Sequence, residues 1–153
     1  MLRSGVKFGC NVHLELFDED GALKEERYAH NLIPTVGLAY IADRLSSSPG
    51  DTLLSHMAVG TGSTAATATD TILGTENARV ALTSFTDSAA VVTFVATFGA
   101  AVGTGGLREA GIFNNATANL GTMLCRVVYD VINKGAADTL VITWTVTASD
   151  DGV

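Results

Sequence analysis

The sequence has few basic residues, no long apolar run and no apolar stretch near its start. Only 9 of the 153 side chains are Lys or Arg, against 16 Asp and Glu, so the formal net charge is −7. An acidic chain without a basic cluster repels phosphates, which excludes ordinary nucleic-acid binding. No segment reaches the ~18 apolar residues of a membrane span, and no signal peptide is recognisable. We therefore expect a protein made in a cytoplasm that binds neither nucleic acid nor membrane.

Cysteine and histidine are too sparse and scattered for a metal site or a disulfide framework. Cys10 and Cys125 stand 115 positions apart, without the spacing of zinc ligands or of a redox Cys-x-x-C pair. The histidines, His13, His30 and His56, lie on separate segments. We expect the two cysteines to be small core residues on strands, and we expect no metal and no cofactor.

Signatures of catalysis are also missing. The chain contains no Gly-x-Ser-x-Gly elbow, and the glycine-rich stretches 60–62 and 103–106 are not followed by the Lys-Ser/Thr of a phosphate-binding loop. Residues 18–21 resemble the start of a calcium loop, but Ala29 stands where that loop needs a bidentate Glu. We predict that the protein is not an enzyme and has no catalytic, cofactor-binding or metal-binding residues.

Thr and Ala are abundant, with 19 and 21 residues, beside 16 Gly and only 2 Pro. Thr favours strands and small residues favour turns, so the composition indicates β structure. A length of 153 residues suits one domain, and a charged fraction of 16% excludes an acidic disordered chain. We therefore predict a single mainly β domain over residues 1–153.

The first segment, residues 8–17, alternates strictly between apolar and polar side chains, which predicts a half-buried strand. An acidic turn at 18–21 and a charged return strand at 22–31 would complete a hairpin. With a four-residue loop, Glu15 faces Lys24 across the two strands.

Residues 36–45 change to a helical period. The apolar residues at i, i+3, i+4 and i+7 are Leu38, Ile41, Ala42 and Leu45. This stripe is expected to pack on a sheet, with Thr35 as the N-cap and the segment 46–50 ending the helix.

Six further strands are expected, over residues 53–60, 79–85, 90–98, 107–113, 120–131 and 139–147. Hairpin-length connections between them favour antiparallel pairing. About eight short strands and one short helix predict an antiparallel β-sandwich, jelly-roll-like or immunoglobulin-like, with the helix at an end or edge.

The segment 60–75, GTGSTAATATDTILGT, is made of small residues except for Ile72 and Leu73. It contains too little apolar surface to form core, so we interpret it as a long loop or arm. It would be mobile alone and would order against a partner, with Ile72, Leu73, Thr61 and Thr64 as candidate contacts. A loop without function is the alternative that the sequence leaves open.

The opening NVHLELFDEDGALKEERYAHNLIPTVGLAYIADRLSS, residues 11–47, resembles a pattern common in tailed-bacteriophage structural proteins. In that pattern a strand, an acidic Asp-Gly turn and a charged return strand lead into a helix of the form HNL…T..GL..I.D.L. The stretches HMAVGTGSTAATATDTILGTE, GLREAGIFN and NKGAADTLVITWTV are similar to later parts of the same proteins. The resemblance spans most of the chain.

The resemblance implies a non-enzymatic virion protein, most like a capsid decoration (cement) protein. Such a protein binds the outside of the capsid and reinforces the lattice of the major capsid protein. The implied partners are the major capsid protein and further copies of this chain, as a dimer or trimer, and the implied location is the virion. Tail-fibre and baseplate collar proteins use similar segments, so a tail component is the alternative. A lectin-like module is the third possibility, although Trp144 is expected on a buried strand.

Overall fold

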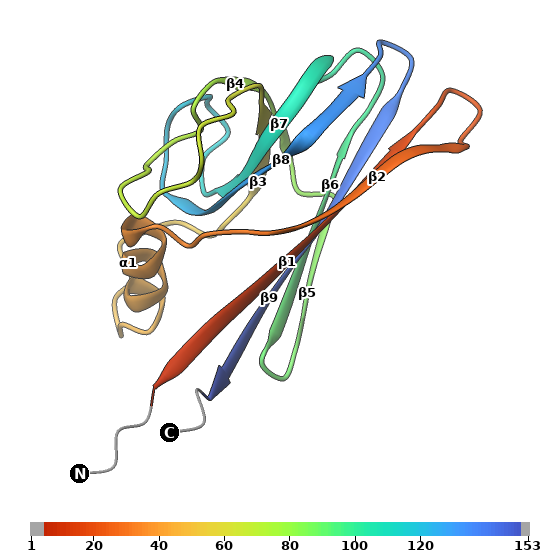
Figure 1. Ribbon diagram of the computed structural model, residues 1–153. Helices are drawn as coiled ribbons and strands as arrows, with labels where there is room; N and C mark the ends of the chain where they lie inside the picture. The colour runs from red at the N-terminus through yellow and green to blue at the C-terminus, as the bar shows by residue number, and fades with distance from the viewer. Residues whose placement is uncertain (1–4, 151–153) are drawn as a thin grey trace.

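The computed structural model, which describes residues 5–150, contains two antiparallel sheets and one short helix (Figure 1). The elements are β1 (Val6–Phe17), β2 (Leu23–His30), α1 (Thr35–Arg44), β3 (His56–Gly60), β4 (Glu76–Ala81), β5 (Ser84–Ser88), β6 (Val91–Phe98), β7 (Gly105–Phe113), β8 (Met123–Lys134) and β9 (Thr139–Asp150). The strand order is β2-β1-β9-β6-β5 in the first sheet and β4-β3-β7-β8 in the second. The prediction of an antiparallel β-sandwich with one short helix is confirmed.

The core lies between the two sheets and follows the alternation of the strands. Along β1 the buried side chains are Cys10, Val12, Leu14 and Leu16, and along β9 they are Leu140, Ile142, Trp144 and Val146. β1 and β9 pair directly over twelve residues, so the two rows lie side by side and form the floor of the core. Residues of β7 and β8 close the core from the other sheet.

The register predicted for the first hairpin is wrong. Glu15 lies opposite Glu26 and not opposite Lys24, and a bulge interrupts the pairing at the end of β1. The register differs because the turn spans five residues, 18–22, and not four. Across this turn the Asp18 N–H donates to the carbonyl of Ala22 at 2.9 Å. The Asp18 carboxylate also accepts the N–H of Ala22, which stabilises this wider turn.

The helix forms where it was predicted, but a different face is buried. Gly37 and Tyr40 face the protein, whereas Leu38 and Leu45 are 50% and 85% exposed. A Cβ at Gly37 would lie 1.9 Å from the carbonyl oxygen of Leu124. The helix therefore contacts β8 through its smallest residue, which allows the two backbones to approach closely.

The N-cap of α1 and the burial of Ile41 also differ from the prediction. Pro34 occupies the N-cap position without a side-chain cap, and Thr35 is the first helical residue. The N–H of Thr35 needs no cap, because it donates to the carbonyl of Ala68 at 2.9 Å. Ile41 is only half-buried, so Ile41→Ala should cost less than the ~2–5 kcal/mol of a fully buried site.

The strand predicted over 79–85 divides into β4 and β5, which belong to different sheets. The chain crosses between the sheets here, since the Leu82 N–H donates to Ser55 and the next N–H, of Thr83, donates to Val95 of the first sheet. The other predicted strands form with shifted ends, and the described residues contain nine strands in place of about eight.

Candidate functional site

Of the small-residue segment 60–75, Gly60 ends β3 and residues 61–75 form a closed loop on the second sheet, which is the loop and not the arm of the two forms expected. Its ends are joined by the Thr61 N–H, which donates to the carbonyl of Thr75 at 2.9 Å. Its middle is tied to α1 by the bond between Thr35 and Ala68. The loop is therefore anchored within the chain, contrary to the expectation of an arm that waits for a partner.

Glu109 of β7 holds both ends of this loop. Its fully buried carboxylate accepts N–H bonds from Gly62, Gly74 and Thr75 at 2.7–2.9 Å. A Cβ at Gly60 or Gly62 would lie only 2.6 or 2.4 Å from the Glu109 Oε1 atom. Glycine is thus required at 60 because the Thr75 carbonyl and the Glu109 carboxylate occupy the space of a side chain, and at 62 because the carboxylate does.

Arg126 of β8 completes a buried ion network under the loop. Its guanidinium donates to Glu109 Oε2 at 2.8 and 3.0 Å, to Asp70 Oδ2 at 2.7 Å and to the carbonyl of Thr64 at 3.1 Å. Burial opposes ionisation of Glu109 and Asp70, but backbone N–H bonds and the Arg126 charge outweigh it. The pKa of each carboxyl is therefore lowered, and the network is ionised at neutral pH.

One of the four candidate contacts is wrong, because Leu73 is buried. It is 2% exposed and packs in a small cluster with Phe113 and Met123, so it cannot touch a partner and the loop does contribute to the core. The remaining candidates stay on the surface: Thr61, Thr64 and Ile72. Their role as partner contacts stays a prediction.

Sequence reasoning missed the two charged residues that organise the loop. Glu109 lies inside the strand predicted at 107–113, and Arg126 lies between Cys125 and Val127 in the strand predicted at 120–131. Charged residues are almost never fully buried unless they are paired. The sequence signal for this network is that Glu109 and Arg126, which have opposite charges, stand among apolar residues on two predicted strands.

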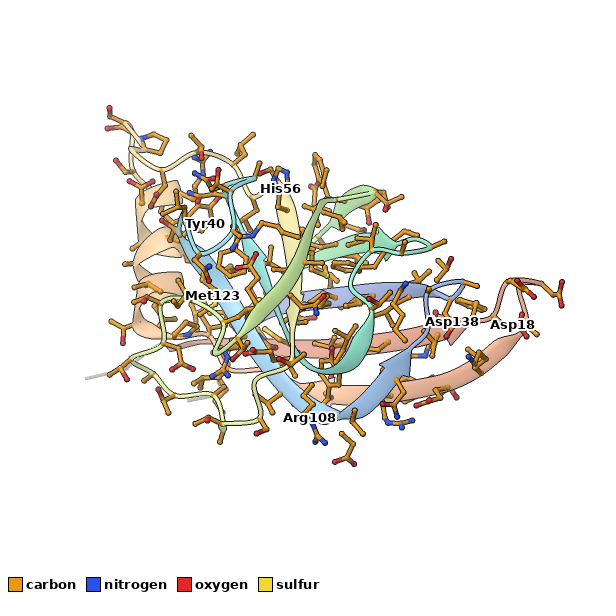
Figure 2. All side chains as sticks on the ribbon, turned by 90° about the horizontal axis from the view of Figure 1, so that it is seen from above. Asp18, Tyr40, His56, Arg108, Met123 and Asp138 are labelled. Carbon is orange, nitrogen blue, oxygen red and sulfur yellow. The ribbon has the colours of Figure 1, made fainter. Side chains whose placement is uncertain are left out.

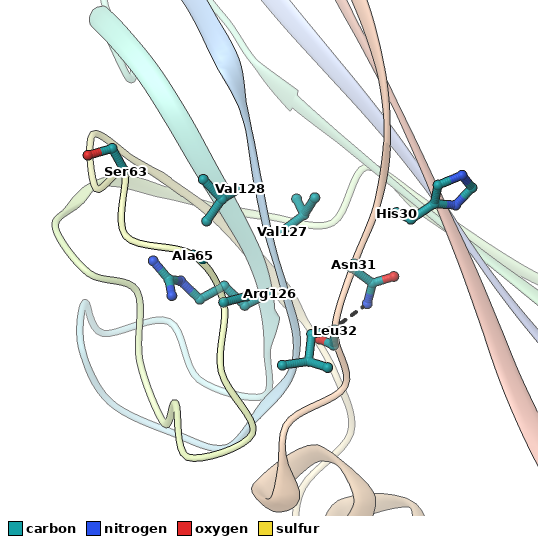
Figure 3. Close-up of a pocket in the computed structure, with 9 residues that line it drawn as sticks. His30, Asn31, Leu32, Ser63, Ala65, Arg126, Val127 and Val128 are labelled. Atoms are coloured by element: carbon teal, nitrogen blue, oxygen red, sulfur yellow. Dashed lines mark hydrogen bonds between the residues drawn. The ribbon is translucent and has the colours of Figure 1, made fainter.

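A shallow depression of about 390 Å³ lies between the loop and the segment that follows β2 (Figure 3). Its labelled lining residues are His30, Asn31, Leu32, Ser63, Ala65, Arg126, Val127 and Val128. Arg126 is already engaged by Glu109, Asp70 and a backbone carbonyl. The depression therefore has mixed polar and apolar walls, and the Arg126 guanidinium is engaged in anchoring the loop.

The two cysteines lie near each other in the core, and His13 and His56 each have their own partners on separate segments. Cys10 and Cys125 are free and buried, as predicted for core residues, and burial raises the pKa of both thiols. His13 stacks on Tyr28, with 4.3 Å between the ring centroids, and lies on the outer side of the first sheet. Within residues 5–150, no three His, Cys, Asp or Glu side chains are grouped so that they could hold a metal ion.

Five of the exposed large apolar side chains belong to α1 and to the segments 45–55, 61–75 and 114–122, whose backbones lie at the same end of the sandwich (Figure 1). We call this the helix-end surface, and its members, each 42–85% exposed, are Leu38, Leu45, Leu53, Ile72 and Leu120. A groove of about 260 Å³ lies between α1, the loop 61–75 and residues 121–123. Thr52 Oγ1 donates to the carbonyl of Asn114 at 3.1 Å. This bond joins the segment before β3, which carries Leu53, to the β7–β8 loop, which carries Leu120.

The opposite end of the sandwich is acidic. Figure 2 shows Asp18 and Asp138 at the end away from Tyr40. Glu19 and Asp20 are exposed in the same turn as Asp18, while Asp138 is paired with Lys24 at 2.8 Å. The turn at residues 18–20 therefore places exposed carboxylates at the end of the sandwich away from α1.

Comparison with protein-family models, curated proteins and solved structures finds no match to this chain. None of the helical structure in residues 5–150 is long and apolar enough to cross a membrane.

Proposed function

We propose that the protein is a non-enzymatic structural component of a tailed-bacteriophage virion. It binds the outside of the capsid and reinforces the lattice of the major capsid protein. The observation that carries the proposal is the helix-end surface, a set of exposed apolar side chains on segments whose backbones lie at one end of the sandwich. Contiguous exposed apolar side chains mark sites of protein contact. The resemblance of residues 11–47 and of the later stretches supplies the virion context.

The helix-end surface is formed before any partner arrives. The loop that carries Ile72 is fixed by Glu109 and Arg126, and α1 is fixed by its close contact with β8. A preformed surface loses less conformational entropy on binding than a segment that must first order. A preformed surface is typical of a protein that functions by binding another protein.

Binding to a lattice also explains how a small domain can stabilise a shell. A single standard interface buries roughly 1,600 Å² in total. Repeating that contact over many capsid subunits multiplies its effect. In this proposal the helix end docks on the capsid, and the acidic turn at residues 18–21 points outward.

Rebinding to phage particles stripped of the protein tests the proposal. The wild-type protein should rebind in stoichiometric amounts, measured by co-sedimentation and gel densitometry. A Leu38→Ser/Ile72→Ser variant should bind at least tenfold more weakly. Leu23→Ser is the matched control, because Leu23 is exposed to the same 50% as Leu38 but follows the acidic turn.

Three outcomes would count against parts of the proposal. Binding to isolated tails and not to capsids would favour the alternative, a tail-fibre or baseplate collar component. Equal binding by the double variant and the Leu23→Ser control would exclude the helix end as the contact surface. No binding to any particle would contradict the virion role itself, provided that the melting temperatures of the variants match that of the wild type.

A further inference from the structure

Each sheet has two edge strands, and contacts within the chain join β2 and β8, which are edges of different sheets. The Arg27 Nη2 atom of β2 donates to the carbonyl of Val131 in β8 at 3.2 Å. An isolated bridge pairs Leu32 with Arg126 on the same side. β2 also carries four charged residues in succession, 24–27. Covered or charged edges of this kind resist pairing with another chain.

The edge strand β4 of the second sheet carries a buried ion pair on one face of the sheet. Arg79 forms an ion pair with Glu76 at 2.8 Å, and both side chains are 2% exposed. The same guanidinium donates to the carbonyls of Asn115 and Leu120 at 2.9 Å, which holds the β7–β8 loop against this strand.

β5, the remaining edge, is open. It pairs with β6 and with no other strand in the described part of the chain. All five of its residues are exposed, and its sequence, SFTDS, contains no Lys, Arg or Pro. Phe85 is 66% exposed in the middle of this strand. An open edge with an exposed aromatic residue is a template for an added strand.

Phe85 belongs to the core-facing side of the first sheet. It lies directly opposite Phe94, which is 7% exposed and part of the core. Directly opposed residues project from the same face of a sheet. Phe85 therefore continues the apolar floor of the core as far as the sheet edge, where nothing in the described chain covers it.

We propose that β5 pairs with the β5 strand of a second copy, antiparallel and around a two-fold axis through Phe85. The two five-stranded sheets then become one ten-stranded sheet. Phe85 faces the partner's Phe85 on the inner side, and Ser84 faces the partner's Thr86 on the outer side. The segment Ser84-Phe85-Thr86 is close to palindromic in chemistry, which is what an isologous contact requires.

Charge disfavours the registers whose two-fold axis passes through Thr86 or Asp87. Asp87 is the one charged residue of β5. An axis through Phe85 places Asp87 opposite the neutral side chain of the partner's Thr83. An axis through Thr86 would oppose each Phe85 to a carboxylate, and an axis through Asp87 would oppose two like charges, which destabilises a sheet.

The contact is small, so the dimer should be weak in solution. A five-residue strand is about 17 Å long, and one strand pair buries much less than the ~1,200 Å² at the lower limit of stable interfaces. The inference goes beyond the proposed function, since it concerns how two copies join and is measured on the free protein. Loss of this dimer and loss of capsid binding can therefore be distinguished.

Disulfide trapping tests the axis directly. Opposed Cα atoms in an antiparallel pair lie about 4.5–5.5 Å apart, which is within the range that a disulfide spans. Phe85→Cys should give a covalent dimer with oxidised glutathione, in which two thiols lose two protons and two electrons and glutathione disulfide becomes two glutathione thiols. Leu53→Cys is the control because Leu53 is also 66% exposed, and the native Cys10 and Cys125 are buried.

Sedimentation velocity over a concentration series tests the contact without a covalent bond. The wild-type protein should associate reversibly, and Phe85→Lys should raise the dimer Kd at least tenfold, while Leu53→Lys should leave it unchanged. The proposal is overturned if Phe85→Cys cross-links no faster than Leu53→Cys. A wild type that stays monomeric up to millimolar concentration, or an oligomer unaffected by Phe85→Lys, would also overturn it.

Discussion

At the scale of single residues, Glu109 and Arg126 form an ion pair with almost no exposure to solvent. Removing two charges from water is costly, and the cost is offset only when both groups are fully bonded. Here Glu109 also accepts three backbone N–H bonds, and Arg126 also binds Asp70. The pair therefore links two neighbouring strands, β7 and β8, to a loop that has little apolar surface of its own.

Glu109→Gln should lower the free energy of unfolding by up to about 3–5 kcal/mol, because it removes the fully buried carboxylate and leaves Asp70 as the one acidic partner of Arg126. Urea unfolding followed by Trp144 fluorescence measures the change. Glu25→Gln is the control, since its ion pair with Arg27 leaves the side chains 28% and 34% exposed and should contribute less than about 1 kcal/mol. Equal losses in the two variants would contradict a structural role for the buried network.

Acid should destabilise the protein through the same carboxyls. The pKa values of Glu109 and Asp70 are lowered in the folded state, so in acid the unfolded chain binds more protons than the folded one. Their contribution is present above the unfolded pKa values, about 4, and is lost as the pH falls through the folded values. The melting temperature should therefore fall between pH 5 and pH 3, and it should fall less in Glu109→Gln. An equal fall in both proteins would contradict this assignment.

At the scale of elements, the position of α1 depends on a residue without a side chain. Gly37→Ala would favour the helix by about 1 kcal/mol at an exposed site. Here the added methyl group would meet the Leu124 carbonyl at 1.9 Å, so we expect a net loss of about 1–3 kcal/mol from strain against β8.

Thermal unfolding of Gly37→Ala and of its reverse control, Ala42→Gly, measures this effect. Ala42 is exposed on the same helix, so the control should lose only the ~1 kcal/mol of helix propensity. Equal or greater stability of Gly37→Ala relative to the wild type would show that α1 does not pack closely on β8.

At the scale of the whole molecule, both sheets contribute to one main hydrophobic cluster. Trp144 of β9 and Ile112 of β7 belong to it, and both are fully buried. Because neither sheet has a separate large core, we expect cooperative two-state unfolding. Trp144 fluorescence and far-ultraviolet circular dichroism should give the same urea midpoint. Two separate transitions would indicate that the sheets, or α1, unfold independently.

Local patterns of apolar and polar residues predict the type of secondary structure along most of the chain. Alternation along β1 and β9 predicted half-buried strands, and the change of period after Pro34 predicted a helix. The sequence also predicted that Cys10 and Cys125 are buried. These features depend on the repeat of apolar side chains within one element, which the local sequence contains in full.

The tertiary structure alone decided which side chains meet. The buried face of α1 depends on how closely Gly37 approaches a strand far along the chain. The small residues of the loop 61–75 contain little apolar area, so the sequence predicted a mobile segment. Buried ion pairs and N–H bonds to Glu109 anchor the loop instead. The open edge at β5 depends on the order of the strands in the sheet, which places this strand outermost. Each of these contacts joins residues distant in sequence, so local patterns carry no information about their distance or orientation.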